Sequence, residues 1–207
     1  MNNRRAIVTS DSGNLAREIL SKAGIARSKE LERGGVSRTQ LRRLLARGEI
    51  ERLGRGLYAL AGRRHDERHD LAEAARRVPT GVVCLLSALR FHGLTTQNPF
   101  EVWMAVSHKA WRPKIDHPPL RLVFLTGRAH SEGVESHDVN GVAVRVFTPA
   151  KTVADCFKFR NKIGIDVAIE ALREFRRLHP AELDSVWRYA RVDRVTRVVQ
   201  PYLDSLE

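Results

Sequence analysis

The feature that most constrains the fold is a short helix that the sequence marks at both ends. Ser37 and Gln40 lie three residues apart, the spacing of a capping box, in which each side chain accepts a backbone N–H at the start of a helix. Gly48 supplies the left-handed residue with which many helices end. The sequence therefore predicts a helix that begins at Arg38 and stops at Gly48.

This helix is predicted to be amphipathic. The apolar stripe, at the i, i+3, i+4 spacing of one helix face, comprises Leu41, Leu44 and Leu45. The opposite face is slender and cationic, and with its flanks it comprises Arg38, Thr39, Arg42, Arg43, Ala46 and Arg47. We expect the leucines to pack into a small core and the arginines to face solvent.

The flanking residues predict a helix-turn-helix followed by a hairpin. A shorter helix over residues 28–33 ends at the glycine pair 34–35, which provides the sharp turn. Two strand-like runs, residues 49–53 and 57–60, flank Gly54-Arg55-Gly56. The hairpin therefore has an arginine at its tip, as the wing of a winged helix often does.

An earlier helix completes the predicted module. Asp11 or Ser12 caps it and Gly24 ends it. Its inward positions have helical spacing and are Leu15, Ile19, Leu20 and Ala23. We expect the polar, basic residues 2–5 to be frayed in solution and available as an arm on DNA. Together these elements predict a winged helix-turn-helix domain over residues 1–64.

The net charge of the chain is concentrated in this module. The whole chain has 36 lysines and arginines against 24 acidic residues, a net charge of +12. Between Arg27 and Arg64 there are eleven basic and four acidic residues, so more than half of the excess lies there. Basic residues often only solubilise a helix, but here they coincide with the face that a winged helix turns toward the major groove. We therefore expect the module to bind double-stranded DNA.

Nine residues are predicted to contact DNA. Seven lie on the helix that would enter the major groove, the recognition helix, or in its cap: Ser37, Arg38, Thr39, Gln40, Arg42, Arg43 and Arg47. The other two, Arg52 and Arg55, lie on the hairpin and should meet phosphate or the minor groove, whereas Thr39 and Arg43 should meet base edges. RNA binding is disfavoured, because stacking on unpaired bases needs aromatic residues and Tyr58 is the only one before Phe91.

The composition is that of a globular protein with a core. The 207 residues are 43% hydrophobic and 29% charged, which suits one large or two small domains. The two cysteines, Cys84 and Cys156, lie in apolar surroundings and predict a reducing compartment without disulfides. No signal peptide is evident, and no apolar run reaches about 18 residues. We expect a cytoplasmic protein that does not enter the membrane.

A second domain with a mixed α/β fold is predicted over residues 65–207, which makes the chain α+β. The apolar run over residues 82–89 predicts a buried helix that continues to Gly93. Strands are predicted at residues 102–106, 120–125 and 142–147. Further helices are predicted after Thr148-Pro149 and at residues 166–178, 180–190 and 193–206.

One charged segment raises the question of a metal site. His65 and His69 lie four residues apart, near Asp66, Glu67 and Asp70. A metalloprotease helix needs His-Glu-x-x-His and a third ligand, whereas the sequence here is His-Asp-Glu-Arg-His. We interpret the segment as a solvated charged face, and we predict no metal ion and no cofactor.

An enzyme of nucleic-acid or nucleotide metabolism, targeted by the winged helix, is the alternative function. Asp155 and Lys151 lie near the start of a predicted helix, and histidines occur at positions 92, 108, 117, 130 and 137. The sequence has no Walker loop, no Gly-x-Ser-x-Gly and no Gly-Ser-x₉-Asp-x-Asp motif. We therefore interpret Asp155 as a structural carboxylate, bonded to a helix terminus or paired with an arginine, and Ser87 and His92 as capping or core groups. No catalytic residue is predicted.

Three segments together resemble the AbiEi family. They are Gly-x-Tyr-Ala-Leu at residues 56–60, Leu-Ser-Ala-Leu with His-Gly-Leu within residues 86–94, and Phe-Thr-Pro-Ala-Lys-Thr-Val-Ala-Asp at residues 147–155. The family comprises transcriptional-regulator antitoxins of type IV toxin–antitoxin and abortive phage infection systems. The resemblance implies a winged helix that represses its own operon, a C-terminal domain needed for antitoxicity, and a nucleotidyltransferase-like toxin as a functional partner without direct binding. A stand-alone regulator of the same architecture stays open.

One winged helix usually covers only half of a DNA site. We therefore expect inverted or direct repeats in the promoter, bound by two copies of a chain that is a monomer or a weak dimer in solution. The last predicted helix either joins two copies or packs on its own domain through its apolar side, which comprises Val195, Val198, Val199, Tyr202 and Leu203.

Overall fold

The computed structural model describes residues 4–62, 66–109, 115 and 117–205. The chain forms two compact units, an N-terminal unit of Met1–Arg76 with Asp138–Ala143 and a C-terminal unit of Arg77–His137 with Val144–Glu207. Helices and strands occur in both units, which confirms the predicted α+β class. The predicted domain boundary between residues 64 and 65 lies outside the described residues and stays a prediction.

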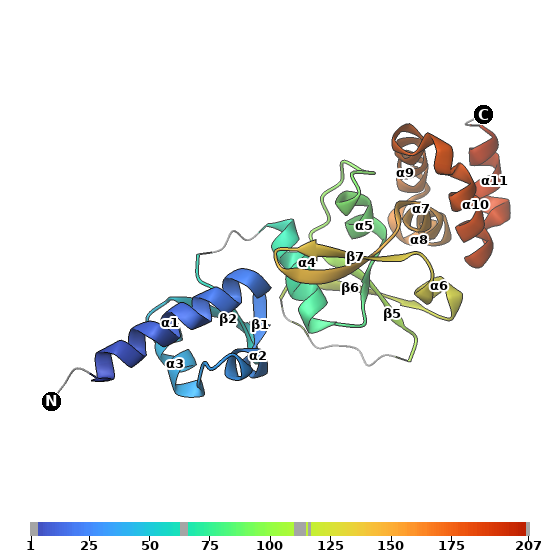
Figure 1. Cartoon of the computed structure of the whole chain (residues 1–207). Helices are drawn as coiled ribbons and strands as arrows, with labels where there is room; N and C mark the ends of the chain where they lie inside the picture. The colour runs from blue at the N-terminus through green and yellow to red at the C-terminus, as the bar shows by residue number, and fades with distance from the viewer. Residues whose placement is uncertain (1–3, 63–65, 110–114, 116, 206–207) are drawn as a thin grey trace. The chain divides into compact units, whose positions relative to one another are not determined.

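Three helices beside a small sheet form the first part of the N-terminal unit (Figure 1). The helices are α1 (Arg4–Ala23), α2 (Ser28–Arg33) and α3 (Arg38–Ala46). The strands are β1 (Ile25–Arg27), β2 (Ile50–Gly54) and β3 (Leu57–Leu60), antiparallel in the order β1-β3-β2. This element order is that of a winged helix-turn-helix, with β2 and β3 as the wing, and it confirms the predicted N-terminal fold.

The core of this unit is built on the predicted leucine stripe. Leu41 and Leu44 of α3 are 3% and 5% exposed, and Leu45 packs partly buried against the same cluster. Their partners come from the other elements and are Ala16, Leu20, Ala26, Leu31, Val36 and Ile50. A nine-residue helix is marginal alone, so this burial, worth about 1.5 to 3 kcal/mol for each leucine, stabilises α3.

Two features of the N-terminal unit differ from the sequence prediction. Helix α1 begins at Arg4, so the predicted cap at Asp11 or Ser12 is wrong. The fraying predicted for residues 2–5 stays a prediction, and residues 2 and 3 lie outside the described residues. Aspartate and serine cost a helix interior less than about 1 kcal/mol each, which does not force a helix to start there. Strand β1 was not predicted either, because three residues are too few to show an alternation of polar and apolar side chains. The strand forms by pairing with β3, where Ile25 lies opposite Ala59.

Helix α4 (Glu67–Arg77) follows the wing and corrects the prediction of a solvated charged face. His69 is 1% exposed and Glu73 is fully buried, with 3.7 Å between the His69 Nε2 and Glu73 Oε2 atoms. A tertiary contact fixes the helix, since Arg76 Nη1 lies 3.0 Å from Glu30 Oε1 of α2. The number of charged residues in a segment does not show whether tertiary contacts of this kind will bury its side chains. His65 lies outside the described residues.

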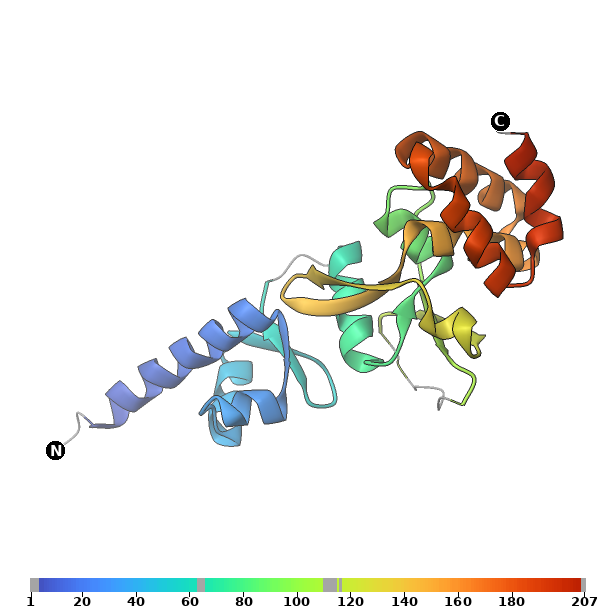
Figure 2. The ribbon, with the colours of Figure 1, turned by 45° about the vertical axis from the view of Figure 1, so that its right-hand side comes forward.

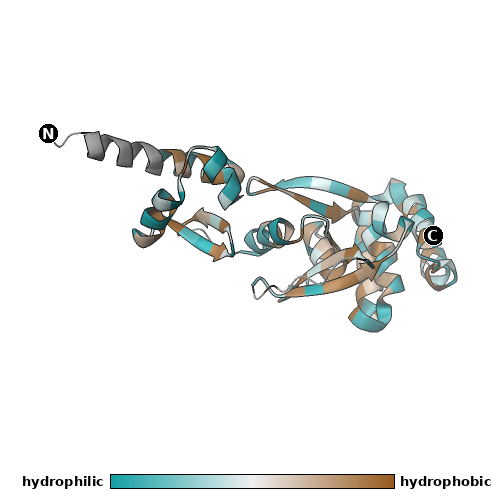
Figure 3. Cartoon of the chain, turned by 90° about the horizontal axis from the view of Figure 1, so that it is seen from below, coloured by the Kyte–Doolittle hydropathy of each residue, from teal (hydrophilic) through white to brown (hydrophobic). Residues whose placement is uncertain are grey.

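The C-terminal unit is built around a five-stranded mixed sheet. Its strands are β4 (Val82–Val83), β5 (Val102–Ser107), β6 (Leu120–Leu125), β7 (Val134–Val139) and β8 (Val142–Phe147), in the order β6-β5-β4-β8-β7. β5 pairs parallel with β6 and antiparallel with β4, which in turn pairs parallel with β8. Figure 3 shows brown hydrophobic segments along strands of this unit beside teal ones. The strands predicted at residues 102–106, 120–125 and 142–147 are confirmed.

Helices complete the C-terminal unit. They are α5 (Leu85–Phe91), α6 (Arg128–Ser131), α7 (Pro149–Lys158), α8 (Arg160–Ile163), α9 (Ile165–Leu178), the 3₁₀ turn η1 (Pro180–Glu182), α10 (Leu183–Val192) and α11 (Thr196–Asp204). α7 is the central helix, because it contacts α5, α8, α9, α10 and α11. Thr148 caps it and Pro149 is its first residue, as predicted. Its buried residues include Val153 and Phe157.

Two predictions for this unit need correction, and three short elements were not predicted. Val82 and Val83 form the strand β4 and not a helix, and both pair with β5. The prediction failed because a continuous apolar run has no periodicity that distinguishes a strand from a helix. The last helix begins at Thr196 and not at Asp193, whose side chain is buried. The short elements β7, α6 and α8 were not predicted.

The apolar side of α11 faces its own unit. Val199 is fully buried and Val195 is 8% exposed, and Val198, Tyr202 and Leu203 pack against the same core. This arrangement confirms packing on its own domain. No helix in the described parts of the chain has an apolar stretch long enough to cross a membrane. Both cysteines are unpaired thiols, and burial raises the pKa of each.

Candidate DNA interface

The recognition helix α3 begins with the predicted capping box. The Ser37 backbone N–H donates to Gln40 Oε1 over 2.7 Å, and the Gln40 backbone N–H donates to Ser37 Oγ over 3.4 Å. At the other end Gly48 has φ +66°, the left-handed conformation that glycine favours. Ser37 and Gln40, both predicted DNA contacts, thus serve first to hold the start of the helix.

The outer face of α3 is exposed as predicted. While Leu41 and Leu44 are buried, the side chains on the other sides of the helix reach solvent, and they are Arg38, Thr39, Arg42, Arg43, Ala46 and Arg47. On the wing, Arg52 and Arg55 are exposed too. Ser37 and Gln40 form the cap of α3. The other seven side chains that were predicted to contact DNA all lie on the surface of one unit.

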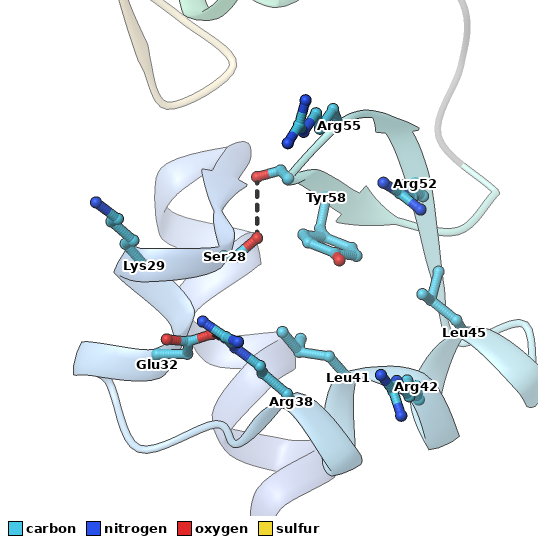
Figure 4. A pocket seen from close by; sticks show the side chains of 11 residues that line it. Ser28, Lys29, Glu32, Arg38, Leu41, Arg42, Leu45, Arg52, Arg55 and Tyr58 are labelled. Carbon is cyan, nitrogen blue, oxygen red and sulfur yellow. Dashed lines mark hydrogen bonds and ion pairs between the residues drawn. The ribbon is translucent and has the colours of Figure 1, made fainter.

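These side chains do not all line the same groove. Helices α2 and α3 and the wing enclose an open groove of about 620 Å³ (Figure 4). The residues that line the groove are Ser28, Lys29, Glu32, Arg38, Leu41, Arg42, Leu45, Arg52, Arg55, Gly56 and Tyr58. Arg38 and Arg42, one helical turn apart, line it from α3. Thr39, Arg43 and Arg47 do not line it.

The wing is tied to α2 at the far end of the groove. The Ser28 backbone N–H donates to the Gly56 carbonyl oxygen over 2.9 Å, and the Ser28 hydroxyl lies 3.4 Å from the same oxygen. Gly56 has φ +72°, and a Cβ atom built there would come within 3.2 Å of Ser28 Oγ. The tip carrying Arg55 therefore has a fixed position relative to the helix-turn-helix.

Sequence reasoning missed two residues of the groove, Lys29 and Tyr58. Tyr58 lies opposite Arg52 in the β2–β3 register, and its half-buried ring stands between the wing and α3 in Figure 4. The predicted hairpin could have indicated that Tyr58 lies beside Arg52, because cross-strand neighbours share one face of a sheet. Lys29 lies on α2, and no local pattern indicates that α2 borders the wing.

The groove is strongly cationic. It is lined by five basic side chains and one acidic side chain, Glu32. Glu32 Oε1 lies 2.8 Å from Arg38 Nε, and this bond raises the pKa of Arg38 and holds its guanidinium in place. Arg47 points elsewhere, since its Nη1 atom lies 3.8 Å from Glu49 Oε1. A groove with this charge, open to solvent, is suited to a phosphate backbone.

The candidate catalytic residue of the alternative function lies in the C-terminal unit and is buried. Asp155 is 1% exposed, and its Oδ1 atom lies 2.5 Å from Nζ of the buried Lys151. The partner is thus a lysine of the same helix, not the arginine or helix terminus that we expected. Ser87 and His92 make core hydrogen bonds as predicted, His92 Nε2 to the Phe147 carbonyl oxygen at 2.7 Å and Ser87 Oγ to the Trp103 backbone N–H at 3.0 Å.

Burial controls the protonation of this cluster. Burial raises the pKa of Asp155 to about 8, with Asp193 acting in the same direction and Lys151 against it. Burial alone would lower the pKa of Lys151, but Asp155 and Asp193 outweigh it and raise that pKa. A carboxyl group without access to solvent has a structural role here. Within the described residues, no three potential metal-ligating side chains are grouped to hold an ion.

A winged helix-turn-helix with a cationic groove beside its recognition helix defines a class of protein, the DNA-binding transcriptional regulators. Residues 14–61 match the model of one family within that class, described as transcriptional regulator, AbiEi antitoxin. The match contains the whole helix-turn-helix and wing except the start of α1. It confirms the resemblance to the AbiEi antitoxin regulators.

The fold of the whole chain has a solved counterpart. The crystal structure of the RV2827C protein from Mycobacterium tuberculosis is similar, with a TM-score of 0.56 over 94% of this chain and 81% of that chain. The two sequences are 13% identical, so the likeness concerns the fold alone. No curated protein matches the sequence.

Proposed function

We propose that the protein is the autorepressing antitoxin of a type IV toxin–antitoxin, or abortive phage infection, system and binds repeats in its own promoter. The family match supports a transcriptional regulator antitoxin. The observation that carries DNA binding is the groove between α3 and the wing, where five basic side chains gather around one acidic one. The alternative enzyme has no comparable support, because Asp155 is buried and paired.

On DNA, α3 enters the major groove. Thr39 and Arg43 then face base edges, where arginine donates to guanine and the threonine methyl group meets thymine. The groove between α3 and the wing follows the sugar–phosphate backbone, with Arg42 on one side and Arg52 and Arg55 on the other. This arrangement is supported at the start of α3 by Ser37, Arg38 and Gln40 and at its end by Arg47. The cap holds the backbone N–H groups of α3 in place.

The remaining parts of the proposal rest on the family. Two copies occupy inverted or direct repeats, and each copy covers one half-site. The C-terminal unit provides antitoxicity against a nucleotidyltransferase-like toxin without binding it directly, and the protein acts in the cytoplasm. It needs no cofactor.

The test is a titration of the chain's own promoter at several salt concentrations, followed by footprinting. We expect log K to fall with log salt at a slope of roughly −4 to −8, for about 5 to 9 neutralised phosphates. The footprint should show two repeated half-sites about one helical turn or a multiple apart. A salt-independent affinity, or one unrepeated site occupied by a single chain, contradicts the proposal.

A further inference from the structure

The loop between α5 and β5, residues 92–101, has the most exposed large apolar side chain among the described residues. Phe100 is 87% exposed, whereas the next, Leu178, is 43% exposed. A single exposed apolar residue is normal on a protein surface. Phe100 differs because it stands at the rim of a pocket of about 320 Å³, whose apolar lining includes Leu86, Pro99 and Trp103. An aromatic ring and an apolar hollow thus lie side by side on one surface of the C-terminal unit.

The loop is held in place at both ends. In Figures 1 and 2 it is drawn in green and runs from α5 past α9 before it returns to β5. Near its start, the Thr95 hydroxyl donates to Glu170 Oε1 of α9 over 3.3 Å. At its end, the Ser87 hydroxyl donates to the Glu101 carbonyl oxygen over 3.4 Å and accepts the Trp103 backbone N–H over 3.0 Å. A loop fixed in this way loses little conformational entropy when its exposed ring is covered.

The charges beside the pocket balance each other. Glu101 is the only charged residue between positions 93 and 107, and Arg121 of β6 is the other charged residue that lines the pocket. The Arg121 Nη1 atom lies 3.7 Å from Glu101 Oε2, and the guanidinium lies 5.3 Å from the centre of the Trp103 ring. The Arg121 side chain is 55% exposed, so its other N–H groups can reach a second carboxylate.

This balance indicates which partner fits the surface. A nucleic acid needs an excess of basic side chains, which the pocket lacks. A surface with one acidic and one basic side chain, and with both a protruding ring and a hollow, is complementary to itself. Self-complementarity is what a two-fold contact between identical chains requires.

We propose that this surface joins two copies of the chain through a two-fold contact. Phe100 of each copy enters the pocket of the other and packs on Trp103, and Glu101 of each copy faces Arg121 of the other. Phenylalanine, tryptophan and arginine are enriched at the centres of protein interfaces. The contact goes beyond the proposed repressor function and does not depend on operator binding.

The contact is small, so the dimer is weak. Eight described residues line the pocket, against roughly 20 to 30 residues on each side of a stable interface. We expect a dissociation constant on the order of 10 to 100 µM, which makes the chain largely monomeric when dilute.

The first experiment is sedimentation velocity of the full-length chain over about 1 to 300 µM, a range that spans this affinity. Phe100→Ala should raise the dissociation constant about 100-fold, because a central aromatic contributes about tenfold and the dimer contains the contact twice. Leu178→Ala, which shortens an exposed apolar side chain elsewhere in the same unit, is the control and should change the constant less than about threefold.

The second experiment exchanges the charges. Glu101→Lys and Arg121→Glu each place like charges opposite one another in a dimer of identical chains, so each variant alone should be monomeric. An equimolar mixture of the two should associate again, because both contacts then join opposite charges. Thermal melting checks that each variant is folded.

Three outcomes overturn the proposal: a chain that stays monomeric at every concentration, which would leave the surface to a different protein, equal effects of Phe100→Ala and Leu178→Ala, and a mixture that does not associate. Phe100→Ala should bind a DNA that contains a single half-site as tightly as the unmodified chain. This measurement separates failure of the dimer contact from failure of the proposed repressor function.

Discussion

Lys151 of α7 contacts Asp193 across 42 residues of sequence, with 3.1 Å between Lys151 Nζ and Asp193 Oδ2. The same ammonium group binds Asp155 one helical turn along α7. All three side chains are almost completely buried. This contact fastens the turn between α10 and α11 to the central helix of the C-terminal unit.

Removal of the lysine should therefore destabilise the C-terminal unit strongly. Lys151→Met leaves two buried carboxyl groups without their common partner, and we expect it to cost about 3 to 5 kcal/mol of the free energy of unfolding. Denaturant titration measures this loss. Lys162→Met, at an exposed position near the end of α8, is the matched control and should change stability by less than about 0.5 kcal/mol. Similar losses in both variants would show that the buried contact is unimportant.

Stability should also depend on pH through Asp155. Because its pKa is raised from 3.8 to about 8 in the folded chain, the folded state holds a proton that the unfolded chain has released. The stabilising contribution is complete below about pH 4 and is lost as the pH rises to about 8, with a slope of at most about 1.4 kcal/mol per pH unit. Asp155→Asn should flatten the free energy of unfolding between pH 5 and 8. The exposed Asp166→Asn should leave that slope as in the unmodified protein, and an unchanged slope in Asp155→Asn would refute the assignment.

The two arginine positions of the DNA interface should behave differently. Arg43 lies outside the groove on the face opposite the leucines, and Arg43→Ala should cost about 1 to 3 kcal/mol on the operator and much less on random DNA. Arg55 lies at the wing tip, so Arg55→Ala should weaken both complexes nearly equally. Anisotropy titrations with the two DNAs measure this. The reverse pattern would mean that the wing selects the sequence and α3 lies against the backbone.

The cap of α3 should contribute to both stability and DNA affinity. Ser37→Ala removes the acceptor of the Gln40 backbone N–H, and we expect a loss of about 0.5 to 2 kcal/mol in the free energy of unfolding of the N-terminal unit. Frayed first turns weaken binding to all sequences alike. Ser37→Asn keeps a capping acceptor and should restore most of the stability. If asparagine lowered the free energy of unfolding as much as alanine, the capping bond would not be the source of the stability.

The sequence by itself determined the DNA-binding module. The signals are local: the Ser37–Gln40 capping box, Gly48 at the helix end, and the hairpin around Gly54-Arg55-Gly56 all act within about three residues. Caps and turns depend on backbone geometry and on nearest neighbours, so their residue types are visible in one sequence. The same holds for Thr148 and Pro149 at the start of α7.

The tertiary structure alone decided which side chains are buried and which surfaces are shared. His69 and Glu73 belong to a charged segment and are nevertheless buried, and Val82 and Val83 become a strand only by pairing with β5. The groove that Arg42 lines and Arg43 does not depends on where the wing packs, and the inward position of Asp193 depends on a lysine 42 residues away. Such contacts join segments that are distant in sequence, and the energy of burial that selects them has no local pattern.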